Sequence, residues 1–138
     1  MSKYKLEHKD ARKPKRGSPG AAGFDLTCVS SREWRPGIIE YDTGVSVEID
    51  PGFVGILCPR SSVSNYDLQL CNSVGVIDSD YRGTIKLRFK QTGDKIYAIG
   101  ERVGQIIFVP YDDFDLEETD ELSDTERGDG GFGSSTLN

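Results

Sequence analysis

The stretch Thr84-Ile85-Lys86-Leu87-Arg88-Phe89-Lys90 alternates apolar and polar side chains at every step. Successive side chains of a β-strand point to opposite faces, so the three apolar residues face one way and the charged residues the other. A strand of this kind has one face in water and one face on a core. The stretch therefore predicts an antiparallel sheet that is covered on one face.

Shorter runs of the same character come before this stretch. Residues 45–49 alternate in the same way, and the turn Asp50-Pro51-Gly52 follows them. Val54, Ile56 and Cys58 then form another alternating run. The order of run, turn and run predicts a hairpin.

The rest of the chain is also typical of an all-β protein. Sixteen glycines and six prolines separate short apolar runs, which is the spacing of a jelly-roll-like β-barrel. The continuous apolar run at residues 106–109 predicts a strand covered on both faces, by the opposite sheet or by another subunit. We expect one short helix, at residues 62–68, with Ser61 or Ser62 as its N-cap.

The pattern of strands stops before the end of the chain. After Leu116 the sequence is dominated by acids, serines and glycines. We therefore expect residues 1–116 to form one jelly-roll domain and residues 117–138 to form a flexible C-terminal arm. A total of 138 residues is the size of one ordinary domain.

The charge distribution limits the classes of function. The net charge of −6 argues against a nucleic-acid surface. Residues 1–16 carry seven basic and two acidic residues, and residues 117–129 carry seven acids and one arginine, which suggests two solvated ends. The chain has neither a run long enough for a membrane span nor an apolar secretory segment near its start. We expect a cytoplasmic or nuclear protein that is not secreted and binds neither membrane nor nucleic acid.

The cysteines point away from a metal or redox site. Cys28, Cys58 and Cys71 form no CxxC pair, and His8 is the only histidine. This pattern argues against a disulfide scaffold, a zinc site and a cysteine nucleophile with a histidine partner. We expect three small, reduced side chains.

One glycine-rich segment matches the glycine pattern of dinucleotide-binding proteins but lacks the elements that normally surround it. Residues 128–133 read GDGGFG and match GxGxxG, but the strand, helix and later acid of a dinucleotide fold are missing. Such a segment suits the wrapping of a ligand, with Arg127 and backbone N–H groups on phosphate and Phe132 on a flat base. A disordered glycine tail is the alternative.

Two further clusters carry chemistry. Residues 72–83 join a strand-like run to Asp78, Asp80 and Tyr81, where a carboxylate beside an apolar pocket suits a general base. Ordinary turn residues are the alternative. Residues 58–62 place an arginine and two serines at a helix start, which suits an anion site or a simple cap. Together the clusters indicate chemistry on a nucleoside phosphate without covalent catalysis.

Read in order, five segments resemble the five motifs of the trimeric dUTPase family. They are residues 21–26 (AAGFDL), 59–62 (PRSS), 75–83 (GVIDSDYRG), 100–107 (GERVGQII) and 127–135 (RGDGGFGSS). The resemblance covers most of the chain, and the third and fifth motifs are the most specific. One departure is Gly104, which stands where the family usually has alanine.

The resemblance implies a jelly-roll subunit, a homotrimer and active sites at the subunit interfaces. It implies hydrolysis of dUTP to dUMP and pyrophosphate, which limits uracil in DNA and supplies dUMP for thymidylate synthesis. It also implies Mg²⁺ held mainly by the triphosphate, so no cluster of protein ligands is expected.

The resemblance also assigns roles to residues. Asp78 would activate the water that attacks the α-phosphorus, and Asp25 would order the hydrogen bonds of the site. The expected substrate contacts are Arg60, Ser61, Ser62 and Gln105 on the phosphates, Asn72, Gly75 and Ile77 on uracil, Tyr81 under the deoxyribose, and Arg127, Phe132, Gly133, Ser134 and Ser135 from the arm.

Two other functions stay open from the sequence alone. A non-enzymatic binding module would have lost Asp78 or the glycine-rich arm, and both are intact. A dCTP deaminase of the same fold would need a cytosine-accepting pocket, and residues 76–81 fit the dUTPase pattern better.

Overall fold

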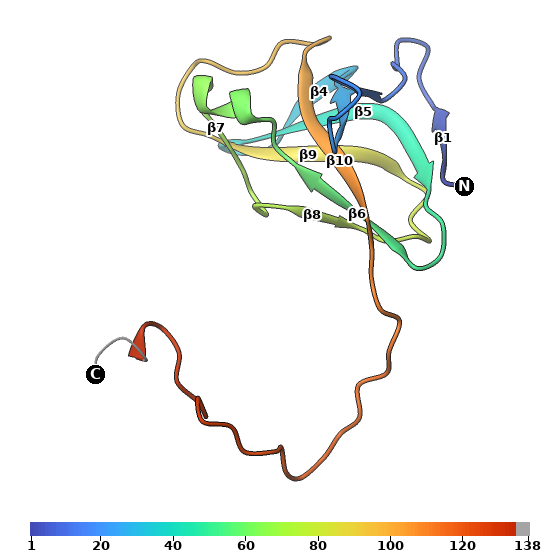
Figure 1. Cartoon of the computed structure of the whole chain (residues 1–138). Helices are drawn as coiled ribbons and strands as arrows, with labels where there is room; N and C mark the ends of the chain where they lie inside the picture. The colour runs from blue at the N-terminus through green and yellow to red at the C-terminus, as the bar shows by residue number, and fades with distance from the viewer. Residues whose placement is uncertain (135–138) are drawn as a thin grey trace.

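Two antiparallel sheets make up the body of the chain in this computed structural model, which describes residues 1–134 (Figure 1). The first sheet has the order β1-β5-β9-β7, and β4 also pairs with β5. Its strands are β1 (Lys3–Leu6), β4 (Ser30–Arg35), β5 (Ile38–Glu48), β7 (Leu68–Leu70) and β9 (Thr84–Gln91).

The second sheet has the order β2-β3-β10-β6-β8. Its strands are β2 (Lys15–Arg16), β3 (Phe24–Thr27), β6 (Phe53–Cys58), β8 (Gly75–Ile77) and β10 (Arg102–Pro110). The all-β, jelly-roll-like prediction is confirmed. Within residues 1–134 the strands form two sheets, and no ladder closes them into a single barrel.

The core lies where the sequence places it. Ile85, Leu87 and Phe89 of β9 are at most 1% exposed, while Lys86 and Lys90 on the same strand are exposed. The Phe89 ring meets the Tyr41 ring edge-on, with their centroids 5.9 Å apart. Burial raises the pKa of Tyr41 to about 12, so its hydroxyl stays neutral and donates to the carbonyl of Tyr97 at 2.9 Å.

The predicted hairpin between β5 and β6 is wrong. The turn at residues 50–52 exists, with the N–H of Phe53 donating to the carbonyl of Asp50 at 3.1 Å, but it carries the chain from the first sheet to the second. The core face of β6 is Gly55 and Leu57, and the alternating residues 54, 56 and 58 face outward. Both faces of β6 are apolar, so alternation alone does not identify the inner one.

The short helix also differs from its prediction. It is a 3-10 helix, η1 (Ser61–Asn65), and Arg60 occupies its N-cap position without a side-chain cap. The helix ends at Asn65, and Tyr66 is already extended, with its N–H donating to the carbonyl of Val63 at 2.9 Å. Asp67 continues in this direction, because its N–H donates to the carbonyl of Lys95 at 2.7 Å and its carboxylate accepts from the N–H of Lys95 at 2.9 Å. Leu68, predicted to be helical, therefore begins β7.

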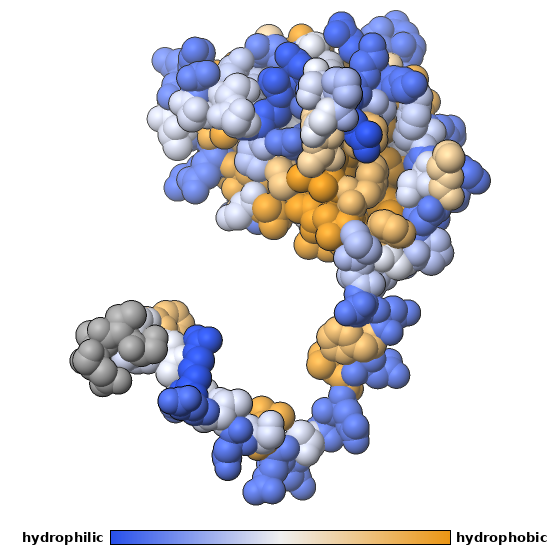
Figure 2. All heavy atoms as spheres, in the orientation of Figure 1, coloured by the Kyte–Doolittle hydropathy of each residue, from blue (hydrophilic) through white to orange (hydrophobic). Residues whose placement is uncertain are grey.

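The apolar run in β10 is covered on one face only within the chain. Ile106 faces the core at 1% exposure, whereas Ile107 faces outward beside its ladder partner Ile56. The residues on this side are apolar and half-buried or exposed, and Figure 2 shows apolar atoms gathered on this part of the body. We call this surface the outer apolar face; its members are Val54, Ile56, Val76, Ile107 and Val109.

The chain leaves the body after β10. The N–H of Tyr111 donates to the carbonyl of Gly52 at 3.0 Å, and the following residues run away from both sheets (Figure 1). Phe114 and Leu116 are exposed. A domain boundary between residues 116 and 117 stays a prediction. No helix in the described residues is long and apolar enough to cross a membrane.

Candidate active site

One groove gathers much of the third motif. It has a volume of about 840 Å³ and is lined on one side by Asn72, Ile77, Asp78 and Tyr81. We call it the first groove. Asp78 directly follows β8 and its side chain is exposed, so it is accessible to both water and ligand. Four residues predicted to contact the nucleoside or the attacking water are therefore brought together by a single chain.

The loop that carries Asp78 is held by its own hydrogen bonds. The N–H of Tyr81 donates to the carbonyl of Asp78 at 3.1 Å, and the Tyr81 hydroxyl donates to the carbonyl of Thr84 at 3.0 Å. A Cβ on Gly83 would overlap the Tyr81 ring, so glycine is needed for this arrangement.

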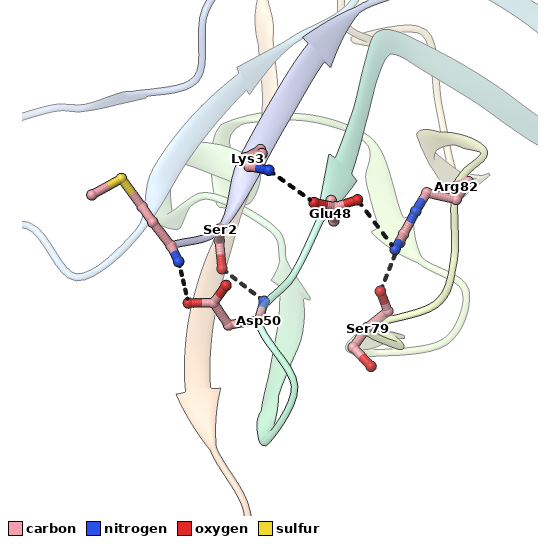
Figure 3. Close-up of polar contacts among 7 residues, drawn as sticks. Ser2, Lys3, Glu48, Asp50, Ser79 and Arg82 are labelled. Carbon is pink, nitrogen blue, oxygen red and sulfur yellow. Dashed lines mark hydrogen bonds and ion pairs between the residues drawn. The ribbon is translucent and has the colours of Figure 1, made fainter.

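Arg82 ties the same loop to the end of β5 (Figure 3). Its Nη1 donates to the carbonyl of Ser79 at 2.7 Å, and its Nη2 lies 3.6 Å from a carboxylate oxygen of Glu48. Lys3 reaches the other oxygen of Glu48 at 3.5 Å. Because Arg82 and Glu48 are both about half exposed, this ion pair contributes little to stability.

Another part of the lining of the first groove is held by a buried carboxylate. Glu40 is 5% exposed and accepts from Arg88 Nε at 2.8 Å and Arg32 Nε at 2.9 Å. Burial alone would raise the pKa of Glu40, but the hydrogen bonds from the two arginines outweigh it and lower the pKa. The guanidinium carbon of Arg88 lies 3.7 Å from the centroid of the Trp34 ring, so Glu40 also fixes that aromatic wall.

We expect Glu40→Gln to lower the free energy of unfolding by about 1–3 kcal/mol, because an amide cannot accept from both arginines. The contribution of the carboxylate is present above its ordinary pKa of 4.5 and is lost as the pH falls through the lowered folded-state pKa. Urea unfolding at pH 7 and pH 4 measures both effects, with Glu33→Gln as the exposed control. Equal stability of Glu40→Gln and the unaltered chain at pH 7 would show that the paired carboxylate contributes nothing.

A second groove, of about 960 Å³, gathers the second motif and basic side chains. Arg60 and Asp25 line it, with Arg60 Nε 3.5 Å from Asp25 Oδ1. The other oxygen of Asp25 is 3.2 Å from Arg102 Nη1, so one carboxylate orients two guanidinium groups. Arg60 also donates to the hydroxyl of Ser62 at 3.3 Å, and Ser61 is exposed at the start of η1.

Gln105 joins the first, second and fourth motifs. It pairs with Asp25 on one side and with Cys58 on the other, and its Nε2 donates to the carbonyl of Pro59 at 3.1 Å. A Cβ on Gly23 would overlap the Gln105 amide, so the glycine of the first motif makes room for it.

Gly104, the departure in the fourth motif, lies on the core side of β10. A Cβ there would come within 2.5 Å of Leu87 Cδ2 and 3.1 Å of the carbonyl oxygen of Cys58. In this chain the space of an alanine methyl is therefore already filled by Leu87.

Asp78 and Arg60 lie near opposite ends of β6. Asp78 shares a depression with Phe53 and Val54 at the start of the strand, whereas Arg60 comes just after its end. Arg60 is six residue steps after Val54, which is about 20 Å at 3.3 Å per residue. The triphosphate of a nucleotide cannot span this distance. One chain therefore does not bring Asp78 and Arg60 to the same ligand.

The arm residues predicted to bind substrate lie away from both grooves. Arg127 Nε donates to the carbonyl of Gly130 at 2.8 Å, and the ring of Phe132 is fully exposed. Gly133 and Ser134 follow it on the arm, and the N–H of Ser134 donates to the carbonyl of Gly131 at 3.1 Å. Ser135 lies outside the described residues.

Part of the second groove is not predicted by the sequence. Arg102 holds Asp25, although it was not singled out, and four basic residues read as a solvated end line the groove wall. Their position follows from the pairing of β2 with β3, in which Arg16 is opposite Phe24. The available signal was the density of charge at residues 12–16 just before the first motif.

Comparisons with known proteins point to one family. A family model described as dUTPase matches residues 9–136. The deoxyuridine 5'-triphosphate nucleotidohydrolase of Escherichia phage T5 is 43% identical over 146 aligned positions that cover 98% of each chain. The protein of the same name from Cutibacterium acnes is 38% identical, over 88% of this chain and 83% of its own. A dUTPase of Staphylococcus bacteriophage 80alpha, solved with dUpNHpp, has a TM-score of 0.82 and 27% identity, with 98% of both chains covered.

Proposed function

Because this chain belongs to the dUTPase family and is a dUTP diphosphatase, we propose that a water attacks the α-phosphorus of dUTP with Asp78 as the general base. The products are dUMP and pyrophosphate. The observation that supports this role is an exposed carboxylate in the lining of a groove that also has aromatic and apolar walls. A carboxylate in that position accepts the proton of the water as the new P–O bond forms. In the cell, this reaction limits uracil in DNA and supplies dUMP for thymidylate synthesis.

Uracil binds along β8 in the first groove. This strand is the edge of its sheet, so part of the backbone of Gly75 and Ile77 has no ladder partner and is available to the base. A Cβ on Gly75 would lie 3.1 Å from Leu57 Cβ and 3.5 Å from Asn72 Nδ2, so the glycine lets β8 pack closely against β6. A methyl group on the base is rejected by overlap, and cytosine is rejected by unpaired polar groups.

The positions of the sugar and the phosphates follow from the placement of uracil along β8. Tyr81 lies under the deoxyribose, with its ring fixed by the Thr84 carbonyl. Arg60, Ser61, Ser62 and Gln105 bind the phosphates, and Asp25 holds the Arg60 guanidinium in place. Charge-assisted hydrogen bonds from arginine are the strong contacts for such oxygens. The arm completes the site with Arg127, Phe132, Gly133, Ser134 and Ser135.

Mg²⁺ accompanies the triphosphate in this proposal. Residues 1–134 contain no group of three or more His, Cys, Asp or Glu side chains placed to hold a metal ion. Phosphate oxygens are the hard ligands that Mg²⁺ prefers, so the triphosphate itself would hold the ion. When bound, the ion neutralises charge on the phosphates. The residues of the second groove would act on the same oxygens.

A complete site needs more than one copy of the chain, and we propose a threefold homotrimer. The positions of Asp78 and Arg60 are about 20 Å apart along β6 at 3.3 Å per residue. The arm leaves the body after β10 (Figure 1), and no residue of it lines either groove. One copy would supply the first groove, a second copy the second groove, and a third copy the arm. The outer apolar face, which nothing in residues 1–134 covers, is a surface for this assembly.

The mass in solution tests the assembly. We expect a mass of three chains at micromolar concentration, and a loss of the trimer in Ile107→Asp, because a buried unpaired charge on the outer apolar face is costly. Ile96→Asp changes an isoleucine outside that face and should leave the trimer intact. A monomer mass together with full activity would overturn the shared site.

The substrate assay tests the function itself. We expect pyrophosphate release from dUTP, little from dCTP or dTTP, and no ammonia from dCTP. Ammonia release from dCTP would favour a deaminase, and no product from any nucleotide would favour a binding module.

A further inference from the structure

The wall of the second groove carries more positive charge than its acids neutralise. Arg12, Lys13, Lys15 and Arg16 line it, and none of the four makes an ion pair within residues 1–134. The groove also contains three more cations, Arg60, Lys95 and Arg102. It contains only two acids, Asp25 and Glu101. Asp25 already pairs with Arg60 and Arg102. The basic residues of the N-terminal segment are therefore available to an anionic partner.

The arm has the opposite character. Residues 112–126 hold nine acids and no basic residue, and all of them are exposed. The arm from residue 111 on has ten acids and one arginine, which leaves sixteen basic and thirteen acidic residues in residues 1–110. The body is thus net positive although the whole chain is net negative. The hydrogen bonds within residues 112–134 are local, such as that from the N–H of Glu121 to the hydroxyl of Thr119.

We propose that the acidic segment, residues 112–126, of one copy docks against Arg12, Lys13, Lys15 and Arg16 in the second groove of another copy. The inference rests on the proposed function, which brings the arm of a neighbour to Arg60 in the same groove. Carboxylates and guanidinium or ammonium groups form charge-assisted hydrogen bonds, and complementary charge speeds the encounter. The docked segment delivers Arg127 and Phe132 to the phosphates and the base.

The chain's own arm starts at the far end of β10 from the second groove, whereas the proposed trimer brings a neighbour's arm to that groove. The own arm begins after Pro110, whereas Arg102 at the other end of β10 lines the groove. The two ends of the strand are eight residue steps apart, about 26 Å at 3.3 Å per residue. The arm also starts in the direction away from the body (Figure 1).

Charge reversal separates this interaction from direct attraction of the triphosphate. Lys13→Glu with Lys15→Glu reverses the groove, and Asp120→Lys with Glu121→Lys reverses the arm. We expect each pair of changes to lower kcat/KM for dUTP by roughly tenfold, since facing like charges repel. The fourfold variant should recover to within about threefold of the unaltered protein. Lys9→Glu with Lys90→Glu, which changes lysines that line neither groove, should neither lower activity nor rescue the arm-reversed protein.

Mixed trimers decide which copy supplies the arm. Co-refolding groove-reversed with arm-reversed chains should give more activity than either protein alone, because some sites then combine a reversed groove with a reversed arm from a neighbour. Loss in the groove-reversed protein without rescue in the fourfold variant would mean that the lysines attract the triphosphate itself, and would overturn the proposal. Rescue in the fourfold variant without recovery in mixed trimers would overturn the role of the neighbour. An unaltered protein that releases no pyrophosphate from dUTP would instead refute the proposed function.

Discussion

Asp78→Asn is expected to lower kcat for dUTP by about 10² to 10⁴, the usual contribution of a general base. The amide has the shape of the carboxylate but cannot accept the proton of the attacking water. Because Asp78 is exposed and makes no ion pair within residues 1–134, its replacement should cost little stability and leave the trimer and nucleotide binding intact. Single-turnover kinetics with dUTP, together with titration of a non-hydrolysable analogue, separates the chemical step from binding.

Asp80→Asn is the matched control, because Asp80 is an exposed acid on the same loop but does not line the first groove. It should retain most of the activity. Turnover of Asp78→Asn within about tenfold of the unaltered protein would be too high for a lost general base.

Removal of the residues after Glu126 should lower kcat/KM for dUTP by about 100-fold while the body stays folded and trimeric. The deleted residues include Arg127 and Phe132, and loss of donors aimed at developing charge typically costs 10²–10³ in rate. Ordering so many glycines costs on the order of 1 kcal/mol or more per residue, so the arm should close only over an intact triphosphate. Stability should change little, because the side chain of Phe132 is fully exposed.

The arm offers a matched pair for this test. Phe132→Ala should weaken binding of dUTP, whereas Phe114→Ala, an exposed aromatic outside the fifth motif, should not. In Phe132→Trp, the fluorescence of the introduced side chain should change when a non-hydrolysable dUTP analogue binds. A truncated protein that works at the full rate would remove Arg127, Phe132, Gly133, Ser134 and Ser135 from the site.

The sequence predicts those parts of the fold in which the apolar side chains are buried within the chain itself. The β9 pattern identifies the core because its charged residues cannot be inside. The same reasoning fails for β6, where Gly55 and Leu57 face the core and Val54 and Ile56 do not, since both sets are apolar. Val54 and Ile56 belong to the outer apolar face, which no part of residues 1–134 covers. Alternation therefore predicts a strand there but not its orientation.

The candidate site also has a part that the sequence predicts and a part that it does not. The family motifs predict its members, and the structure brings Asn72, Ile77, Asp78 and Tyr81 into one groove. The sequence does not predict the role of the cations at residues 12–16. Their place in the groove depends on the pairing of β2 with β3, which brings them close to Arg60 although they are far from it in the sequence. Spacing along a chain carries no information on such a contact.

Subunit mixing of two inactive proteins tests the shared active site most directly. Asp78→Asn chains supply an intact arm, and chains truncated after Glu126 supply an intact Asp78. If each site draws these elements from different copies, an equimolar mixture of co-refolded trimers should have about a quarter of its sites complete, from random placement around the threefold axis. We expect dUTP hydrolysis to recover to about that fraction of the unaltered rate. Mixed trimers that form but stay as inactive as their parents would contradict it.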